Sequence, residues 1–117
     1  MTSASYVLAD ELIATKPNAT RRFVEATARA IEWSRATPED EVVARMRRII
    51  ADRKRNEDDS AIGYWKRTQA ATRGGVIEAR EFQTWIDWLE RDGQIQAGRI
   101  RASALYTNRL NPYATSP

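Results

Sequence analysis

The sequence contains neither cysteine nor histidine among its 117 residues. These two absences exclude disulfides, thiolate chemistry, the usual zinc sites and nucleophiles activated by histidine. They also exclude a histidine switch near neutral pH. An enzyme built on this chain would depend on carboxylates, lysine, tyrosine or serine alone. We therefore expect no enzyme activity, no catalytic residue, no metal site and no cofactor.

Long apolar runs are also missing, because no segment approaches the ~20 residues that a membrane-spanning helix needs. The first residues, Met-Thr-Ser-Ala-Ser-Tyr, carry neither the basic nor the apolar region of an export signal. We expect no membrane insertion, and a cytoplasmic location for the chain as written. Hydrophobic residues make up 42% and charged residues 30% of the sequence, which is typical of one small folded domain.

What the sequence does contain is a series of helical patterns. The expected fold is mainly α, with about five helices after one short N-terminal strand in a single unit over residues 1–117 that ends in a polar tail at 111–117. The strand is expected at residues 5–9, where Ser-Tyr-Val-Leu-Ala is apolar and rich in strand-forming side chains. Proline and capping signals, together with apolar spacing of three and four, place the helices. Their expected ranges are 11–15, 17–35, from 37 to about 52, 62–72 and 78–92, and a further short helix is expected near 102–109.

The expected strand has no evident partner elsewhere in the sequence. A strand needs a neighbour for its backbone N–H and C=O groups, and residues 75–77 are too few to supply one. Either residues 5–9 belong to helix or coil, or their partner lies outside this chain. We interpret this as a sign that the chain is a fragment of a larger protein.

The four tryptophans separate into two kinds by their position on the helical stripes. Trp65 and Trp85 lie on apolar stripes, and Trp85 shares its stripe with Phe82, Ile86 and Leu89, so one buried face is expected there. Trp33 and Trp88 lie about one residue off their stripes, which favours exposure at an interface. The unpaired strand and these two side chains predict a homo-oligomer. The expected self-association residues are Tyr6, Val7, Leu8, Trp33 and Trp88.

The charged clusters suggest solvated surfaces more than binding sites. The basic residues between 45 and 55 form a possible phosphate-binding stripe, but acidic residues interrupt it and no recognition motif accompanies it. The net charge is only +3, so no nucleic-acid partner is expected. Three adjacent acids at 57–59 point in different directions around a helix start, which favours interaction with the helix dipole over a metal site.

The order of the segments resembles the C-terminal part of ABC-transporter solute-binding proteins of the nitrate, sulfonate and taurine group, which includes relatives that bind thiamine-pyrimidine precursors. Residues 6–13 (YVLADELI) resemble the strand and short helix that return to the first lobe of those proteins, and residues 16–26 (KPNATRRFVEA) resemble a helix that begins with proline. Later segments of the chain resemble later segments of those proteins in the same order. They are residues 30–33, 37–39 and 75–77, the WIDWL motif at 85–89, residues 93–95, where a glycine ends a helix, and residues 105–110.

This resemblance implies part of the solute-binding component of an ABC importer for a small anion or a heteroaromatic precursor. The partners would be an ABC permease and a small-molecule ligand, and the family is exported, either periplasmic or lipid-anchored. Most ligand-contacting loops of that family have no counterpart here, so no ligand-binding residue is carried over and no ligand binding by the chain alone is expected. Two alternatives stay open, a small helical self-association module and a helical protein associated with nucleic acid through residues 45–55.

Overall fold

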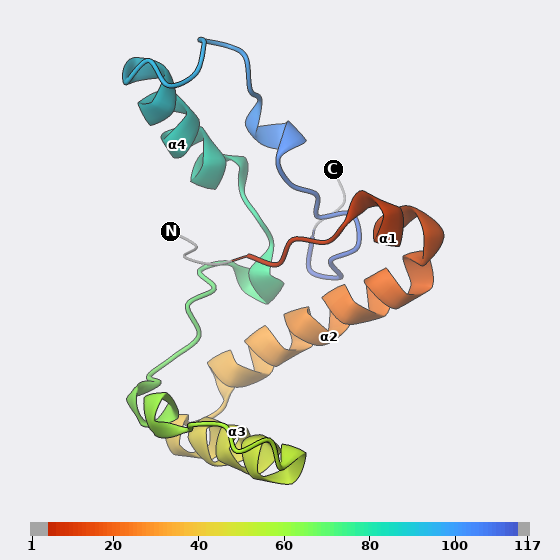
Figure 1. The fold of residues 1–117 in the computed structure, drawn as a ribbon, viewed down its shortest axis with the longest axis vertical. Helices are drawn as coiled ribbons and strands as arrows, with labels where there is room; N and C mark the ends of the chain where they lie inside the picture. Colours follow the sequence, from red (N-terminus) through yellow and green to blue (C-terminus); the bar gives the residue numbers. More distant parts are fainter. Residues whose placement is uncertain (1–4, 115–117) are drawn as a thin grey trace.

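The computed structural model describes residues 5–114, and this part of the chain is mainly helical and contains no strand. Four α-helices and three 3-10 segments succeed one another along it (Figure 1). The elements are α1 (Asp10–Thr15), α2 (Pro17–Ala36), α3 (Glu39–Arg53), η1 (Ser60–Tyr64), η2 (Arg73–Gly75), α4 (Ala79–Arg91) and η3 (Ala102–Ala104).

The observed bounds of α1 to α4 lie within one or two residues of the ranges expected from the proline and capping signals. Pro17 is the first residue of α2, where its missing N–H costs nothing, and Pro38 is the residue just before α3. The buried Thr20 hydroxyl donates to the Lys16 carbonyl at 3.0 Å and lies 3.3 Å from the Leu12 carbonyl. This side chain therefore ties the end of α1 to the first turn of α2.

Residues 5–9 run as a drawn-out trace before α1 (Figure 1), with extended backbone angles at Ala9, but they do not form the expected strand. Tyr6, Val7 and Leu8 make no backbone hydrogen bond to any other residue in the described range 5–114. A strand forms only when a second strand pairs with it, and residues 5–114 contain no such strand. No partner for this segment was evident in the sequence either. The expected strand is therefore replaced by unpaired extended backbone.

The helix expected over residues 62–72 is also wrong. Only the 3-10 turn η1 forms there, and the chain then runs extended toward η2. The Arg35 guanidinium of α2 donates hydrogen bonds to the carbonyls of Ala70 and Thr72. These two carbonyls therefore bond to α2 and not to N–H groups of a local helix. The short helix expected near 102–109 shrinks to the three residues of η3, because Asn108 pairs with the backbone of Ile77.

The interior of the molecule is small and the arrangement of helices is open. The extensive contacts between elements join α2 to η2, α4 to η3, α1 to α2 and α3 to η1, so the three long helices diverge from one another (Figure 1). The radius of gyration is 17.3 Å, whereas a compact domain of this length has about 13 Å. The accessible surface is 9404 Å², about 2,900 Å² more than a folded monomer of this mass exposes.

The apolar face of α4 is only partly covered, which corrects the expectation of one buried face. Ile86 is buried, and the Phe82 ring stacks on Tyr106 with the ring centroids 5.7 Å apart. Trp85, however, is 52% exposed, and its ring lies edge-on to that of Trp88 on the same helix. At roughly 100° per residue, the apolar residues of this helix span an arc of about 160°. The thin η3 segment covers one side of that arc and leaves the tryptophan side open.

Candidate functional site

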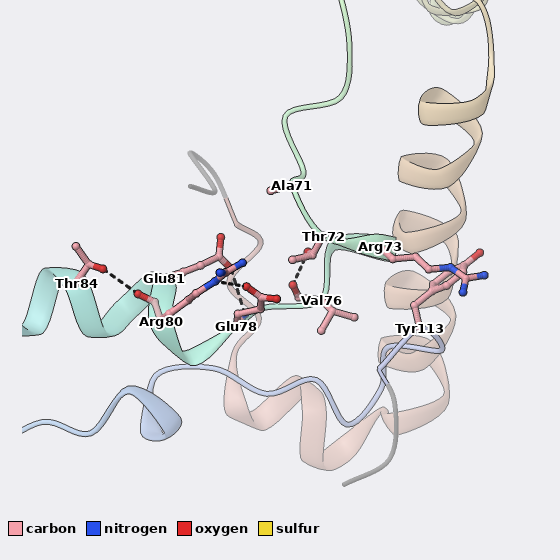
Figure 2. A pocket seen from close by; sticks show the side chains of 9 residues that line it. All are labelled: Ala71, Thr72, Arg73, Val76, Glu78, Arg80, Glu81, Thr84 and Tyr113. Atoms are coloured by element: carbon pink, nitrogen blue, oxygen red, sulfur yellow. Dashed lines mark hydrogen bonds and ion pairs between the residues drawn. The ribbon is translucent and has the colours of Figure 1, made fainter.

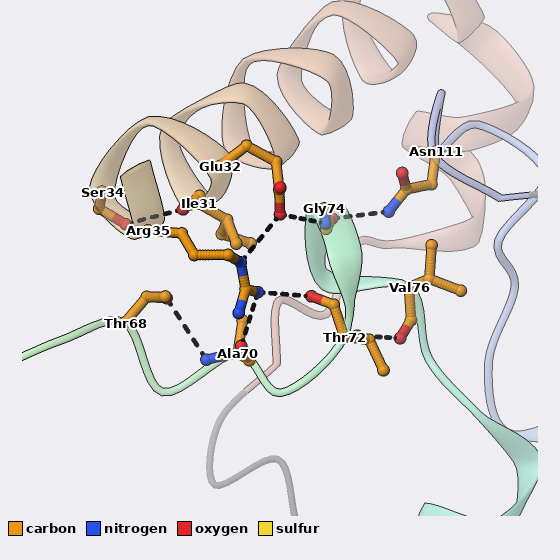
Figure 3. A network of polar contacts seen from close by, with 10 residues as sticks. All are labelled: Ile31, Glu32, Ser34, Arg35, Thr68, Ala70, Thr72, Gly74, Val76 and Asn111. Atoms are coloured by element: carbon orange, nitrogen blue, oxygen red, sulfur yellow. Dashed lines mark hydrogen bonds and ion pairs between the residues drawn. The ribbon is translucent and has the colours of Figure 1, made fainter. Parts of the chain in front are cut away.

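The most connected polar cluster of the described chain surrounds Gly74, and we call it the Gly74 junction. From α2, the Arg35 guanidinium donates to the carbonyls of Ala70 and Thr72, both at 2.8 Å. The Glu32 carboxylate accepts the Gly74 N–H at 2.7 Å and an Arg35 N–H at 3.3 Å (Figure 3). One turn of α2 thus holds backbone groups of three alternate residues, Ala70, Thr72 and Gly74, in the segment that precedes α4.

The C-terminal segment holds the same junction from the other side. The Asn111 amide donates to the Gly74 carbonyl at 2.9 Å. The Asn108 amide donates to the Ile77 carbonyl at 2.8 Å and accepts the Ile77 N–H at 3.0 Å. This second pairing replaces the two hydrogen bonds that a neighbouring strand would give to Ile77. Residues 111–114 of the expected polar tail are therefore packed against the fold, and residues 115–117 lie outside the described range.

Two features of the position of Gly74 favour glycine. Its φ of +59° lies in the left-handed region. A Cβ at this position would lie 2.3 Å from Cδ2 of the Tyr113 ring. The Arg73 guanidinium lies over the Tyr113 ring, with its Cζ atom 5.1 Å from the ring centroid. The junction is thus built around a close approach of backbone to an aromatic ring.

The charge at the junction is locally compensated. The hydrogen bond from the Gly74 N–H lowers the pKa of the Glu32 carboxyl, burial opposes this shift, and the hydrogen bond and charge of Arg35 add to the lowering. Glu32 therefore stays ionised below the usual carboxylate range. Its role is to fix backbone, because both of its partners belong to the fold.

An open hollow of about 740 Å³ lies beside the junction, toward the start of α4 (Figure 2). Its polar groups are largely engaged within the protein. Arg80 pairs with Glu78, and Glu78 and Glu81 form a reciprocal capping box at the first turn of α4. Carboxylates already occupy the helix N-terminus, so the hollow has no built site for an anion. The residues that line it are Ala71, Thr72, Arg73, Val76, Glu78, Arg80, Glu81, Thr84 and Tyr113.

The residues expected to mediate self-association are not part of the hydrogen bonds of the junction and are largely exposed. Tyr6 is 73% and Val7 91% exposed, and Leu8 is half-buried. Trp33 on α2 and Trp88 on α4 are each about half exposed, as their off-stripe positions suggested. These five side chains belong to three different elements, and self-association stays a prediction.

The charged clusters form ion pairs at the surface. Arg47 lies 3.7 Å from Asp59, and Arg53 lies 3.3 Å from Glu57, so acidic residues interrupt the basic stripe in space as well as in sequence. The Asp58 carboxylate accepts the backbone N–H and the hydroxyl of Ser60, both at 2.9 Å, and these two hydrogen bonds lower the pKa of that carboxyl. Within residues 5–114, no three carboxylates gather closely enough to hold a metal ion.

Sequence reasoning did not identify the Gly74 junction. Glu32 and Arg35, three residues apart on a helix, have the ordinary pattern of a surface ion pair. The glycines at 74 and 75 lie just after the helix expected over 62–72, and Asn111 is the first residue of the expected polar tail. The available signal was the combination of two glycines with two late asparagines, since both residue types favour turns held by side-chain hydrogen bonds.

Comparison with models of protein families, with curated protein sequences and with solved structures finds no match to this chain. In the described part of the chain, no helix combines the length and the apolar character that crossing a membrane requires.

Proposed function

We propose that this chain is the C-terminal helical part of the solute-binding component of an ABC importer for a small anion or a heteroaromatic precursor. The order of sequence segments described above supports this assignment. In this proposal the chain is not a catalyst. Its partners are the rest of the binding protein, an ABC permease and the ligand. The expected location of the chain as written is the cytoplasm.

The observation that carries the proposal is the open arrangement of the helices. Helices that cover a sheet bury one apolar face on that sheet and need little contact with one another. The helices α2 and α4 fit this description, because Phe23, Trp33, Trp85 and Trp88 remain 40–52% exposed. The excess surface of about 2,900 Å² is of the size that such a sheet would cover.

The ligand in this proposal is bound mainly by groups outside the chain. The hollow beside the Gly74 junction offers side chains that are already paired within the fold. The contribution of the chain is therefore to complete and stabilise a lobe, and the Gly74 junction keeps α2 and α4 at the spacing that this requires.

Complementation tests the proposal. A binding protein of the nitrate, sulfonate and taurine group, truncated before its matching C-terminal segment, is co-expressed with the tagged chain. We expect the two polypeptides to co-purify in a 1:1 ratio, and titration calorimetry with taurine, nitrate and an aminopyrimidine to detect binding by the complex and none by the chain alone.

Two matched variants show whether the open face of α4 carries the contact. Trp88→Lys places a charge on that face and should abolish co-purification. Gln83→Lys places the same side chain on the polar face, where Gln83 now bonds Asp87 at 2.7 Å, and should leave it unchanged. Failure of the wild-type chain to co-purify with folded truncated protein would contradict the proposal.

A second candidate function is a small helical self-association module. The specific observation in its favour is the extended segment at residues 5–9, whose backbone groups have no partner in the described structure. The nucleic-acid alternative gains no support, because Arg47 and Arg53 pair with acidic neighbours.

A further inference from the structure

The extended segment at residues 5–9 is prepared for pairing with another strand. Its one described backbone hydrogen bond is from the Ile13 N–H to the Ala9 carbonyl at its end, which belongs to the start of α1. The backbone polar groups of Tyr6, Val7 and Leu8 are without partners among the described residues. A row of unpaired N–H and C=O groups on extended backbone is a template for strand addition.

The segment is also held in place on the protein. The Tyr6 ring meets the Phe23 ring of α2 edge-on, with the centroids 5.3 Å apart. Leu8 is half-buried, whereas Val7 between them is 91% exposed. Leu8 is the one side chain of residues 5–9 that is partly buried, since Tyr6 is itself 73% exposed. The ring contact of Tyr6 and the partial burial of Leu8 anchor the segment, which lowers the entropic cost of pairing.

We propose that two copies of this chain associate by antiparallel pairing of residues 5–9 about a two-fold axis at Val7. In this register Val7 lies opposite Val7 of the second copy, Tyr6 lies opposite Leu8, and Ser5 lies opposite Ala9. Each pair is uncharged, and the aromatic–aliphatic pair is among the favourable cross-strand combinations. The segment is thus its own complement under the symmetry that most homodimers use.

The surface area of the chain is sufficient for such a dimer. A standard interface buries about 600–1,000 Å² on each partner. The chain exposes about 2,900 Å² more than a folded monomer of its mass over its whole surface, and the Phe23 ring, 42% exposed beside Tyr6, is the part that adjoins residues 5–9. A five-residue ladder alone is too short to be stable, so the ladder sets the register and the adjoining apolar surface supplies the remaining contact.

Light scattering on the full chain at micromolar concentration tests the dimer, and charge reversal at Val7 tests the register. We expect the wild-type chain to have twice the mass of one chain. Val7→Asp and Val7→Lys each place like charges opposite each other and should give the mass of one chain. The conservative Val7→Thr should remain dimeric. An equimolar mixture of the Asp and Lys variants should recover the double mass, because opposite charges then face each other.

Each other outcome overturns the proposal. A single-chain mass for the wild type removes the dimer, and a Val7→Asp variant that stays dimeric removes this contact. Far-UV circular dichroism of the variants checks that helix content is unchanged, which is expected because Val7 is almost fully exposed. The inference rests on the self-association alternative and not on the importer proposal: a failed complementation leaves the dimer mass unaltered, and a monomeric wild type leaves complementation untouched.

Discussion

Replacing Gly74 by alanine tests whether the Gly74 junction holds the fold together. The residue has a φ of +59°, and an alanine in the left-handed region costs about 1–2 kcal/mol. The added Cβ would also lie 2.3–2.8 Å from three carbons of Tyr113. Relieving such overpacking costs a further ~1–3 kcal/mol. We therefore expect Gly74→Ala to lower the free energy of unfolding by about 2–5 kcal/mol.

Gly93 offers a matched control for the backbone contribution. Its φ is +74°, and a Cβ there would meet nothing within 4 Å. Gly93→Ala should therefore cost only the backbone component of about 1–2 kcal/mol. Urea unfolding followed by circular dichroism measures both variants, and the difference between them isolates the steric effect of Tyr113.

A double variant shows how much of the cost of Gly74→Ala comes from the Tyr113 ring. A Tyr113→Ala background removes the contacts with Cδ2 and Cγ and leaves only Cβ of residue 113 at 2.8 Å, so the cost of Gly74→Ala should fall toward the cost measured at Gly93. The coupling between the two substitutions should be about 1–3 kcal/mol. Equal costs for the two glycine variants, or a Gly74→Ala cost that is indifferent to Tyr113, would refute the reasoning.

Three further predictions follow from the packing, the charge and the composition. Ile86→Ala should lower the free energy of unfolding by about 2–5 kcal/mol, because Ile86 is buried. Trp85 is half exposed, so Trp85→Ala should lower it by only ~1–2 kcal/mol. Urea denaturation measures both variants, and the reverse order would contradict the prediction. The pKa of Glu32 is lowered from an ordinary value of 4.5, so its contribution to stability is complete above that value and is lost as pH falls through the lower folded pKa. Glu32→Gln should flatten this acid-side loss in unfolding curves recorded from pH 7 to about pH 3. Elemental analysis of the purified chain should detect no stoichiometric zinc or iron, since Cys and His are absent.

The helices that local patterns specify were predictable from the sequence. Prolines at 17 and 38 start helices because the missing N–H is harmless there, and apolar spacing marks the faces of α2, α3 and α4. The segment at 62–72 was not predictable in this way. Its carbonyls at Ala70 and Thr72 bond to Arg35, which lies 35 or more residues earlier in the chain, and no local pattern encodes that choice.

The exposure of Trp85 shows a similar limit. Periodicity identifies the apolar side of α4, but it does not state how much of that side another element covers. The element that packs on α4 is the short η3 segment, and Ile86 is buried whereas the two tryptophans stay about half exposed. Burial of a stripe depends on the size of its neighbour, and that size is a property of the tertiary arrangement.

By itself, the sequence determined the absence of cysteine and histidine chemistry, the mainly helical character and the boundaries of the long helices, since each of these depends on residue type or near-neighbour spacing. Only the tertiary structure decided that residues 5–9 stay extended without a partner, that Glu32, Arg35, Asn108 and Asn111 converge on one backbone segment, and that the long helices diverge. The physical reason is that hydrogen bonds and burial between distant segments depend on how the whole chain is arranged, whereas helix starts and stops depend on a few adjacent residues.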